Sequence, residues 1–157
     1  MNVQEQRKLM LRQLKENLSN LDRSLEALRY SYSKCTTIIE KAEYNHNEQE
    51  SFEALTSRFA RTSDIFTQKV LKTLFSLIQE YPKTFIDAAN LLEKVEIINN
   101  ADDILNIREL RNQIAHEYVN DDLRALFTDV LQFVPELEQV VKNVKTYVEN
   151  NILGLKR

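Results

Sequence analysis

Apolar residues recur through the first forty positions of the chain at alternating steps of three and four. This spacing predicts a long amphipathic helix whose apolar seam faces another helix. The seam suits either a coiled-coil dimer or the first helix of a bundle. Two of its members, Tyr32 and Cys35, favour the bundle, because they suit dissimilar neighbours better than a regular zipper does. The seam consists of Leu11, Leu14, Leu18, Leu21, Leu25, Leu28, Tyr32, Cys35 and Ile39.

A second apolar stripe predicts a helix over residues 48–81 that pairs antiparallel with the first. The stretch 44–47 between the two is polar and poor in helix formers, so it predicts a turn. Tyr81 and Pro82 predict the end of the second helix, because a residue before proline avoids helical angles and Pro82 can open the next helix. The stripe consists of Phe52, Leu55, Phe59, Phe66, Val70, Leu74 and Leu77.

Three further helices are predicted: one over residues 83–98, one that starts within the polar stretch 99–103 and runs to 119, and one over 122–150, with a kink near Phe133 caused by Pro135. One glycine and two prolines leave little turn chemistry, which agrees with an all-α fold. The length of 157 residues fits one domain. We therefore expect a single all-α domain over 1–157, an up-down helical bundle of about five helices with a long N-terminal hairpin.

The net charge and the distribution of apolar residues limit the classes of binding partner and the cellular location that the sequence allows. The formal net charge of -3 provides no general basic field, so any contact with nucleic acid must rest on a local patch. One cysteine cannot form an internal disulfide, and no apolar run is long enough for a signal peptide or a membrane span. The sequence thus predicts a cytoplasmic protein that does not bind membranes.

A group of cations along the second predicted helix is one candidate for such a patch. When residues advance about 100° each, the four fall within a narrow arc beside the apolar stripe. This arc is either a solvated face or a track for phosphate groups, and the second interpretation makes its residues possible RNA-binding residues. They are Arg58, Arg61, Lys69 and Lys72.

The arginine of the fourth predicted helix is the clearest departure from a plain scaffold. Arg111 falls within about 60° of the apolar residues of that helix, including Ile107 and Ile114. A buried guanidinium without a partner is costly, so this position predicts a bound anion, a carboxylate from elsewhere, or a cleft. His116 lies about 140° away, on the face it shares with Asn112.

On a regular helix, the side chains of Arg111 and His116 therefore point in different directions. For both to reach one substrate, the helix must loosen near Glu117, or a second copy of the chain must complete the site across a two-fold axis. A homodimer with a composite cleft satisfies the geometry best.

The residue types in this stretch suit RNA cleavage. An arginine binds phosphate bidentately, an imidazole exchanges protons near neutral pH, and the amide of Asn112 can orient either group. His116 would act as general base or acid while the ribose 2′-hydroxyl attacks phosphorus, and Arg111 would stabilise the developing charge. The alternative is structural: an arginine flanking the core and a histidine near a helix end. One histidine without further ligands at a suitable spacing does not make a metal site, so neither metal nor cofactor is expected.

The string Arg111-x4-His116-x-Tyr118 resembles the R-x4-H-x-Y signature of the HEPN superfamily, specifically the toxin of prokaryotic HEPN/MNT toxin–antitoxin pairs. Asn112 matches the polar residue that often follows the motif arginine. At the level of residues the resemblance rests on positions 111–118, while the layout of helices agrees along the chain.

The resemblance implies an HEPN-like fold and a metal-independent endoribonuclease with Arg111 and His116 as its catalytic pair. Asn112 would orient groups or contact substrate, and two subunits would share one cleft. The implied partner is a minimal nucleotidyltransferase antitoxin that can transfer AMP from ATP to Tyr118, placing bulk and negative charge beside Arg111. The alternative for Tyr118 is a structural role, in which the residue belongs to the apolar stripe of the fourth predicted helix and its hydroxyl lies at the edge of that stripe.

Two further hypotheses remain at this level. The chain could be a non-catalytic subunit that binds a nucleotide or a substrate for a nucleotidyltransferase, since relatives of that kind share the bundle. It could instead be a structural protein that assembles through the N-terminal seam, in which case Leu18 and Leu25 would matter and Arg111 would not.

Overall fold

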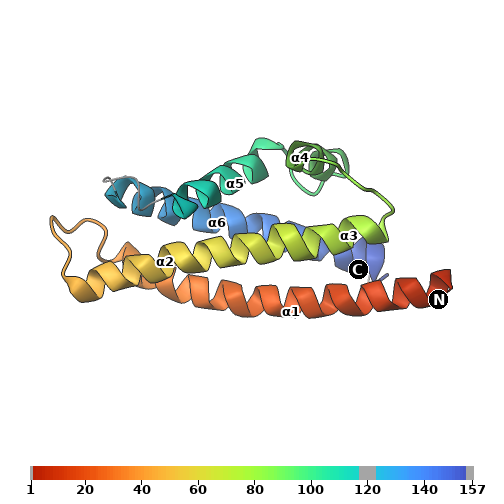
Figure 1. The fold of residues 1–157 in the computed structure, drawn as a ribbon, viewed down its shortest axis with the longest axis horizontal. Coiled ribbons are helices and arrows are strands. Elements are labelled where there is room, and N and C mark those ends of the chain that lie inside the picture. Colours follow the sequence, from red (N-terminus) through yellow and green to blue (C-terminus); the bar gives the residue numbers. More distant parts are fainter. Residues whose placement is uncertain (1, 117–122, 155–157) are drawn as a thin grey trace.

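The first helix spans most of the length of the molecule (Figure 1). The computed structural model describes residues 2–116 and 123–154, and this part of the chain contains helices and no strand. Helix α1 (Val3–Thr36) begins with a capping box, in which the Asn2 side chain accepts from the backbone N–H of Glu5. The helix therefore begins eight residues before the first leucine of the predicted seam.

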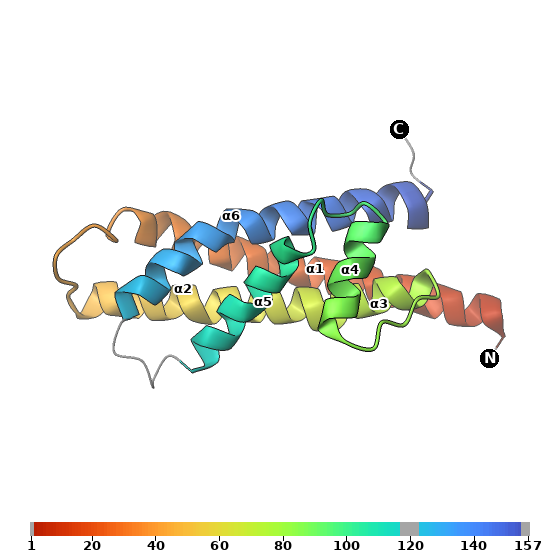
Figure 2. The same cartoon turned by 90° about the horizontal axis from the view of Figure 1, so that it is seen from above.

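The second long rod combines three helical segments in one line. They are α2 (His46–Asp64), a π-helix η1 (Ile65–Val70) and α3 (Leu71–Leu77). The rod runs antiparallel beside α1, as predicted (Figures 1 and 2). The π-helix was not predicted, because its residues continue the same apolar pattern.

This rod ends at Leu77, four residues before Tyr81, the end that Pro82 predicted. Gln79 adopts a left-handed backbone with φ of 59°, and the N–H of Glu80 bonds the carbonyl of Phe75 at 2.9 Å. This arrangement is the terminal cap that usually employs glycine at the left-handed position. Because a glutamine occupies it, the sequence carries no signal for this end.

Three further helices complete the bundle: α4 (Phe85–Lys94), α5 (Asp102–Ala115) and α6 (Leu123–Tyr147), which a short π-helix η3 (Val148–Ile152) extends. Thr84 caps α4, two residues after the proline that was expected to open it. Helix α6 continues through Pro135. With each continuous rod counted once, the described residues form five helical rods, which confirms the predicted all-α bundle with a long N-terminal hairpin.

The rods surround one hydrophobic cluster. Helix α6 packs on α1 and α2, α5 packs on α2 and α6, and α4 packs on α5. Figure 2 shows that α4 also crosses over α3. Burial of these apolar side chains is the main favourable term in folding. Fully buried members from the four long elements include Leu14, Leu21, Leu28, Phe52, Phe59, Phe66, Ile104, Ile107, Val130, Val134 and Leu137.

The seam of α1 is used inside the chain. Leu21 and Leu28 have no exposed surface, and Leu25 is 3% exposed, so these leucines are not available for assembly with another molecule. Polar contacts accompany them: the side-chain amide of Asn17 donates to the hydroxyl of Thr73 at 3.2 Å. The seam therefore serves the intramolecular bundle, the alternative that Tyr32 and Cys35 favoured.

Candidate functional site

Arg111 lies near the C-terminal end of α5, where that helix meets the last residue of α2. Its Nε donates to Oδ1 of Asp64 at 2.8 Å, and its Nη2 donates to Oδ2 at 2.9 Å. The two side chains are 26% and 32% exposed, so the pair is mostly, though not fully, withdrawn from water. Of the three partners predicted for Arg111, the structure provides the carboxylate from elsewhere in the chain.

The ion pair fixes both the charge and the direction of the guanidinium. The hydrogen bonds donated to Asp64, helped by the carboxylate charge and opposed by burial, raise the pKa of Arg111 above its ordinary value. A guanidinium carries five N–H donors, and Asp64 accepts from two of them. Both N–H groups of Nη1 thus stay outside the pair with Asp64, at a side chain that water can still reach.

Asn112 and His116 lie on a different face of α5. Both are exposed, and His116 closes the helix, with its backbone N–H bonded to the carbonyl of Gln113 at 3.1 Å. No hydrogen bond or ion pair joins His116 to Arg111 within the part of the chain that the structure describes. One chain therefore presents the two predicted catalytic residues in different directions, as the helical geometry predicted.

The expected continuation of α5 falls partly outside the described residues. The helix was predicted to reach residue 119, and within the described part it ends at Ala115. Tyr118, the predicted site of modification, lies outside the described residues, as does Glu117, near which the helix would loosen in one of the two alternatives.

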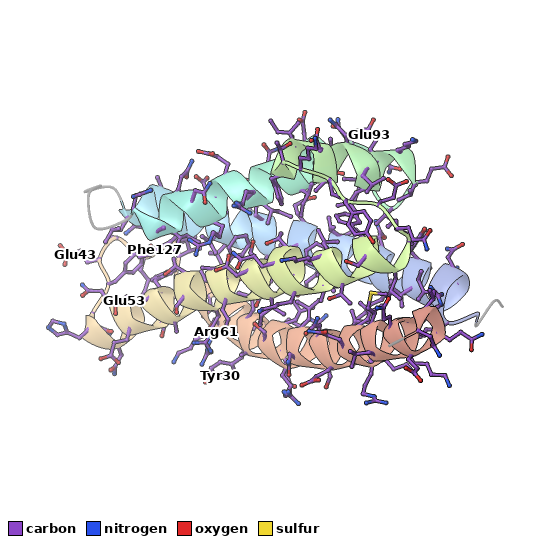
Figure 3. All side chains as sticks on the ribbon, turned by 45° about the vertical axis from the view of Figure 1, so that its right-hand side comes forward. Tyr30, Glu43, Glu53, Arg61, Glu93 and Phe127 are labelled. Atoms are coloured by element: carbon purple, nitrogen blue, oxygen red, sulfur yellow. The ribbon has the colours of Figure 1, made fainter. Side chains whose placement is uncertain are left out.

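The four cations predicted to share one arc point in different directions. Arg58 packs against α1, where its Nη1 donates to the hydroxyl of Ser31 at 2.8 Å, whereas Lys72 lines a hollow next to α4. Arg61 projects from the hairpin surface (Figure 3), and Lys69 is exposed. The arc was derived for a regular α-helix, but η1 lies between Arg61 and Lys72 and turns less per residue, since its hydrogen bonds span five residues. Arg58 and Lys72 therefore do not share the single ridge that the regular helix predicted.

Asp64 is the residue of this site that sequence reasoning missed. It is the only acidic residue between residues 54 and 77, where it lies among the cations Arg58, Arg61 and Lys69. An isolated carboxylate in a basic segment was the available signal. The sequence alone could not pair it with Arg111, because the two are 47 positions apart.

Arg124 holds the first turn of α6, two residues after the undescribed segment 117–122. Its guanidinium donates to the carbonyls of Ile39 and Lys41, both at 2.8 Å, and lies 4.5 Å from the ring centre of Tyr44. Nearby, Phe127 lies inside the bundle and stacks on Phe52 with ring centres 4.6 Å apart (Figure 3). The start of α6 is thereby attached to the connection between α1 and α2, a contact that the sequence did not indicate.

Comparisons with known proteins find no matching family, no similar curated protein and no similar solved structure. Within residues 2–116 and 123–154, no three His, Cys, Asp or Glu side chains gather into a group that could hold a metal ion. No helix in the same ranges has both the length and the apolar character needed to cross a membrane.

Proposed function

We propose that this chain is a metal-independent endoribonuclease of the HEPN toxin type, with Arg111 and His116 as its catalytic pair and Asn112 as an orienting group. The observation that carries the proposal is the orientation of Arg111, the arginine of the R-x4-H-x-Y string. Asp64 holds it by two hydrogen bonds and leaves Nη1 for a phosphate.

The reaction needs only groups that this chain and RNA supply. The ribose 2′-oxygen forms a bond to the adjacent phosphorus, and the bond from phosphorus to the 5′-oxygen breaks. One imidazole removes the proton of the 2′-hydroxyl, and a protonated imidazole donates to the leaving 5′-oxygen. Arg111 stabilises the charge on the non-bridging oxygens. The products are a 2′,3′-cyclic phosphate and a 5′-hydroxyl.

A homodimer provides the geometry that one chain lacks. Arg111 faces α2, while Asn112 and His116 are exposed on another face of α5. Two copies that meet through this exposed face would bring both imidazoles and both Arg111 side chains to one cleft. In this proposal a minimal nucleotidyltransferase antitoxin neutralises the toxin and can AMPylate Tyr118, where the added negative charge would compete with RNA phosphate for Arg111.

The test compares RNA cleavage by the purified full chain and by three variants. His116→Ala and Arg111→Ala are expected to slow cleavage by about 10²–10⁴-fold. The matched control is His46→Ala, which removes the other histidine, exposed at the start of α2, and should cleave as the wild type does. Intact RNA after incubation with wild-type protein would count against the proposal, as would full activity of His116→Ala.

One observation favours a second function, a non-catalytic partner that holds a nucleotide or substrate for a nucleotidyltransferase. Asp64 already balances the charge of Arg111, which lowers the attraction of this site for a polyanion. This alternative predicts a stable complex with the nucleotidyltransferase and no cleavage by the purified chain. Cleavage that Arg111→Ala abolishes would exclude it.

A further inference from the structure

A partly apolar hollow lies between α3, the connection that follows it, and α4. The crossing of α4 over α3 can be followed in Figure 2. Its volume is about 320 Å³, near the lower end of the range of small-ligand pockets, about 300–1,000 Å³. Its walls combine apolar and aromatic groups with a few polar ones. The residues that matter here are Leu71, Lys72, Phe75, Glu80, Tyr81 and Phe85.

Tyr81 is an exposed aromatic residue at the rim of this hollow. Its side chain is 73% exposed, and it also borders a second hollow of about 360 Å³ on the side of Lys83 and Lys94. An aromatic residue gains little from such exposure in an isolated protein, whereas it can stack on a flat partner. Phe85 provides a second ring, and the guanidinium of Arg108 lies 4.8 Å from its centre.

Cations lie at two sides of the aromatic group. Lys72 lines the hollow, on the side to which the π-helix turns it, and Arg108 lies over Phe85. Within the described ranges no carboxylate forms an ion pair with either cation. Aromatic rings flanked by cations are the combination that recognises single-stranded nucleic acid, because every base offers a flat face and every nucleotide a phosphate.

The hollow adjoins the Arg111–Asp64 pair along two helices. Arg108 precedes Arg111 by three residues, so the two are neighbours on the surface of α5. Thr67, which also lines the hollow, follows Asp64 by three residues, a rise of about 5 Å. The stacking residue Tyr81 lies beyond the end of α3, and the 13 residues from Asp64 to Leu77 rise about 20 Å. A strand with one phosphate at Arg111 therefore reaches Tyr81 several nucleotides further along.

We propose that Tyr81 and Phe85 form a stacking subsite for an unpaired base of the RNA, with Lys72 and Arg108 contacting the flanking phosphates. This inference rests on the proposed ribonuclease function and names the part of the substrate that the chain holds outside the reacting phosphate. Glu80, at the rim, can accept a hydrogen bond from an exocyclic amino group of the base.

The test measures binding separately from cleavage. The probe is a short single-stranded RNA with 2′-O-methyl riboses, which cannot attack phosphorus, and with one 2-aminopurine as a fluorescent base. Tyr81→Ala is expected to weaken binding about tenfold and to abolish the fluorescence quenching that stacking causes. Tyr81→Phe keeps the ring and should bind within about twofold of wild type. Tyr30→Ala, which removes a tyrosine of 65% exposure from α1, is the matched control and should also be unchanged.

Each contrary result points to one proposal. Unchanged binding by Tyr81→Ala overturns the stacking subsite, and RNA cleavage by the same wild-type preparation would leave the ribonuclease proposal intact. Equal affinity for a duplex of the same sequence also overturns the subsite, because paired bases cannot enter it. Binding that depends on Tyr81 supports the subsite. If the wild-type protein binds in this way but does not cleave natural RNA, only the proposed ribonuclease activity is overturned.

Discussion

Arg111 of α5 and Asp64 of α2 bind each other through two parallel hydrogen bonds of 2.8 and 2.9 Å. The pair has two roles in our account. It joins the helix that carries Arg111 and Asn112 to the N-terminal hairpin, and it orients the guanidinium proposed to bind phosphate. Stability and activity can therefore be measured on the same two residues.

For stability, we expect a double-mutant cycle of Asp64→Ala and Arg111→Ala to give a coupling energy of about 1–2 kcal/mol, measured by urea unfolding. The value exceeds that of a surface pair because the geometry is bidentate and both groups are largely withdrawn from water. The control is the pair Arg29–Glu138, a single contact of 3.1 Å with Arg29 55% exposed, where about 0.5 kcal/mol or less is expected. Additive effects of the two substitutions would show that the Arg111–Asp64 contact contributes nothing in solution.

For activity, Asp64→Asn should separate binding from catalysis. The substitution removes a negative charge beside Arg111, so the KM for RNA should fall or stay constant. It also replaces one of the two acceptor oxygens by an N–H group, which cannot accept from the guanidinium, so Arg111 is held by one hydrogen bond and kcat should fall about 10–100-fold. Steady-state cleavage rates measure both effects. A variant with unchanged kcat would mean that Asp64 does not position Arg111 for the reaction.

The left-handed end of α3 offers a stabilising substitution. Gln79 has φ of 59° in a cap that glycine suits, and its side chain is exposed. Gln79→Gly should therefore raise the free energy of unfolding by about 0.5–1 kcal/mol, because a residue with a Cβ is strained in this region. Gln68→Gly, at an exposed position inside η1, is the control and should lower it by a similar amount. Thermal unfolding followed by circular dichroism would detect both changes in stability. If the two substitutions changed the stability in the same direction, the left-handed cap at Gln79 would be contradicted.

The thiol of Cys35 should be unreactive in the folded chain. Burial raises the pKa of Cys35 from 9.0 to about 11, with Lys34 opposing the shift. At pH 8 the thiolate fraction falls about 100-fold, so a thiol reagent should modify the folded chain at least that much more slowly than the urea-unfolded chain. Equal rates would contradict the burial of the thiol.

The same shift predicts a stability change in alkali. Because the folded pKa is raised, the contribution of this thiol to stability is complete below pH 9 and is lost as the pH rises from 9 towards 11. Cys35→Ala should lack this part of the alkaline loss. Urea unfolding of both proteins at pH 8 and pH 10.5 provides the measurement.

Long-range pairing explains where prediction from the sequence succeeded and where it did not. The hairpin of α1 with the α2–α3 rod was predictable, because its apolar period extends over many turns and only one arrangement buries both stripes. The position of Arg111 on an apolar stripe required a partner, and this too followed from local geometry. The identity of that partner did not, because several carboxylates could satisfy the same requirement and only the packing of α5 on α2 selects Asp64.

The π-helix limited prediction in a different way. Residues 65–70 carry no proline or glycine, and their apolar residues continue the stripe, so nothing marks the change in hydrogen bonding. Angles derived for a regular helix do not apply to Lys72, which lies beyond η1. The cap at Gln79 was hidden for a similar reason, since a glutamine occupies a position where glycine would have been recognised.

The π-helix behaves as one extra residue inserted into an otherwise regular rod. Deletion of one residue from 65–70 would restore an α-helix and leave the direction of α3 unchanged, because the smaller turn per residue of η1 already absorbs the rotation of about 100° that the extra residue would add. Asp64 would keep its place opposite Arg111, Lys72 its place at the hollow and Thr73 its place beside Asn17. The rod can therefore lose one residue within η1 while the arginine site and the α3–α4 surface keep their side-chain directions, whereas a deletion within α2 would rotate one relative to the other by about 100°.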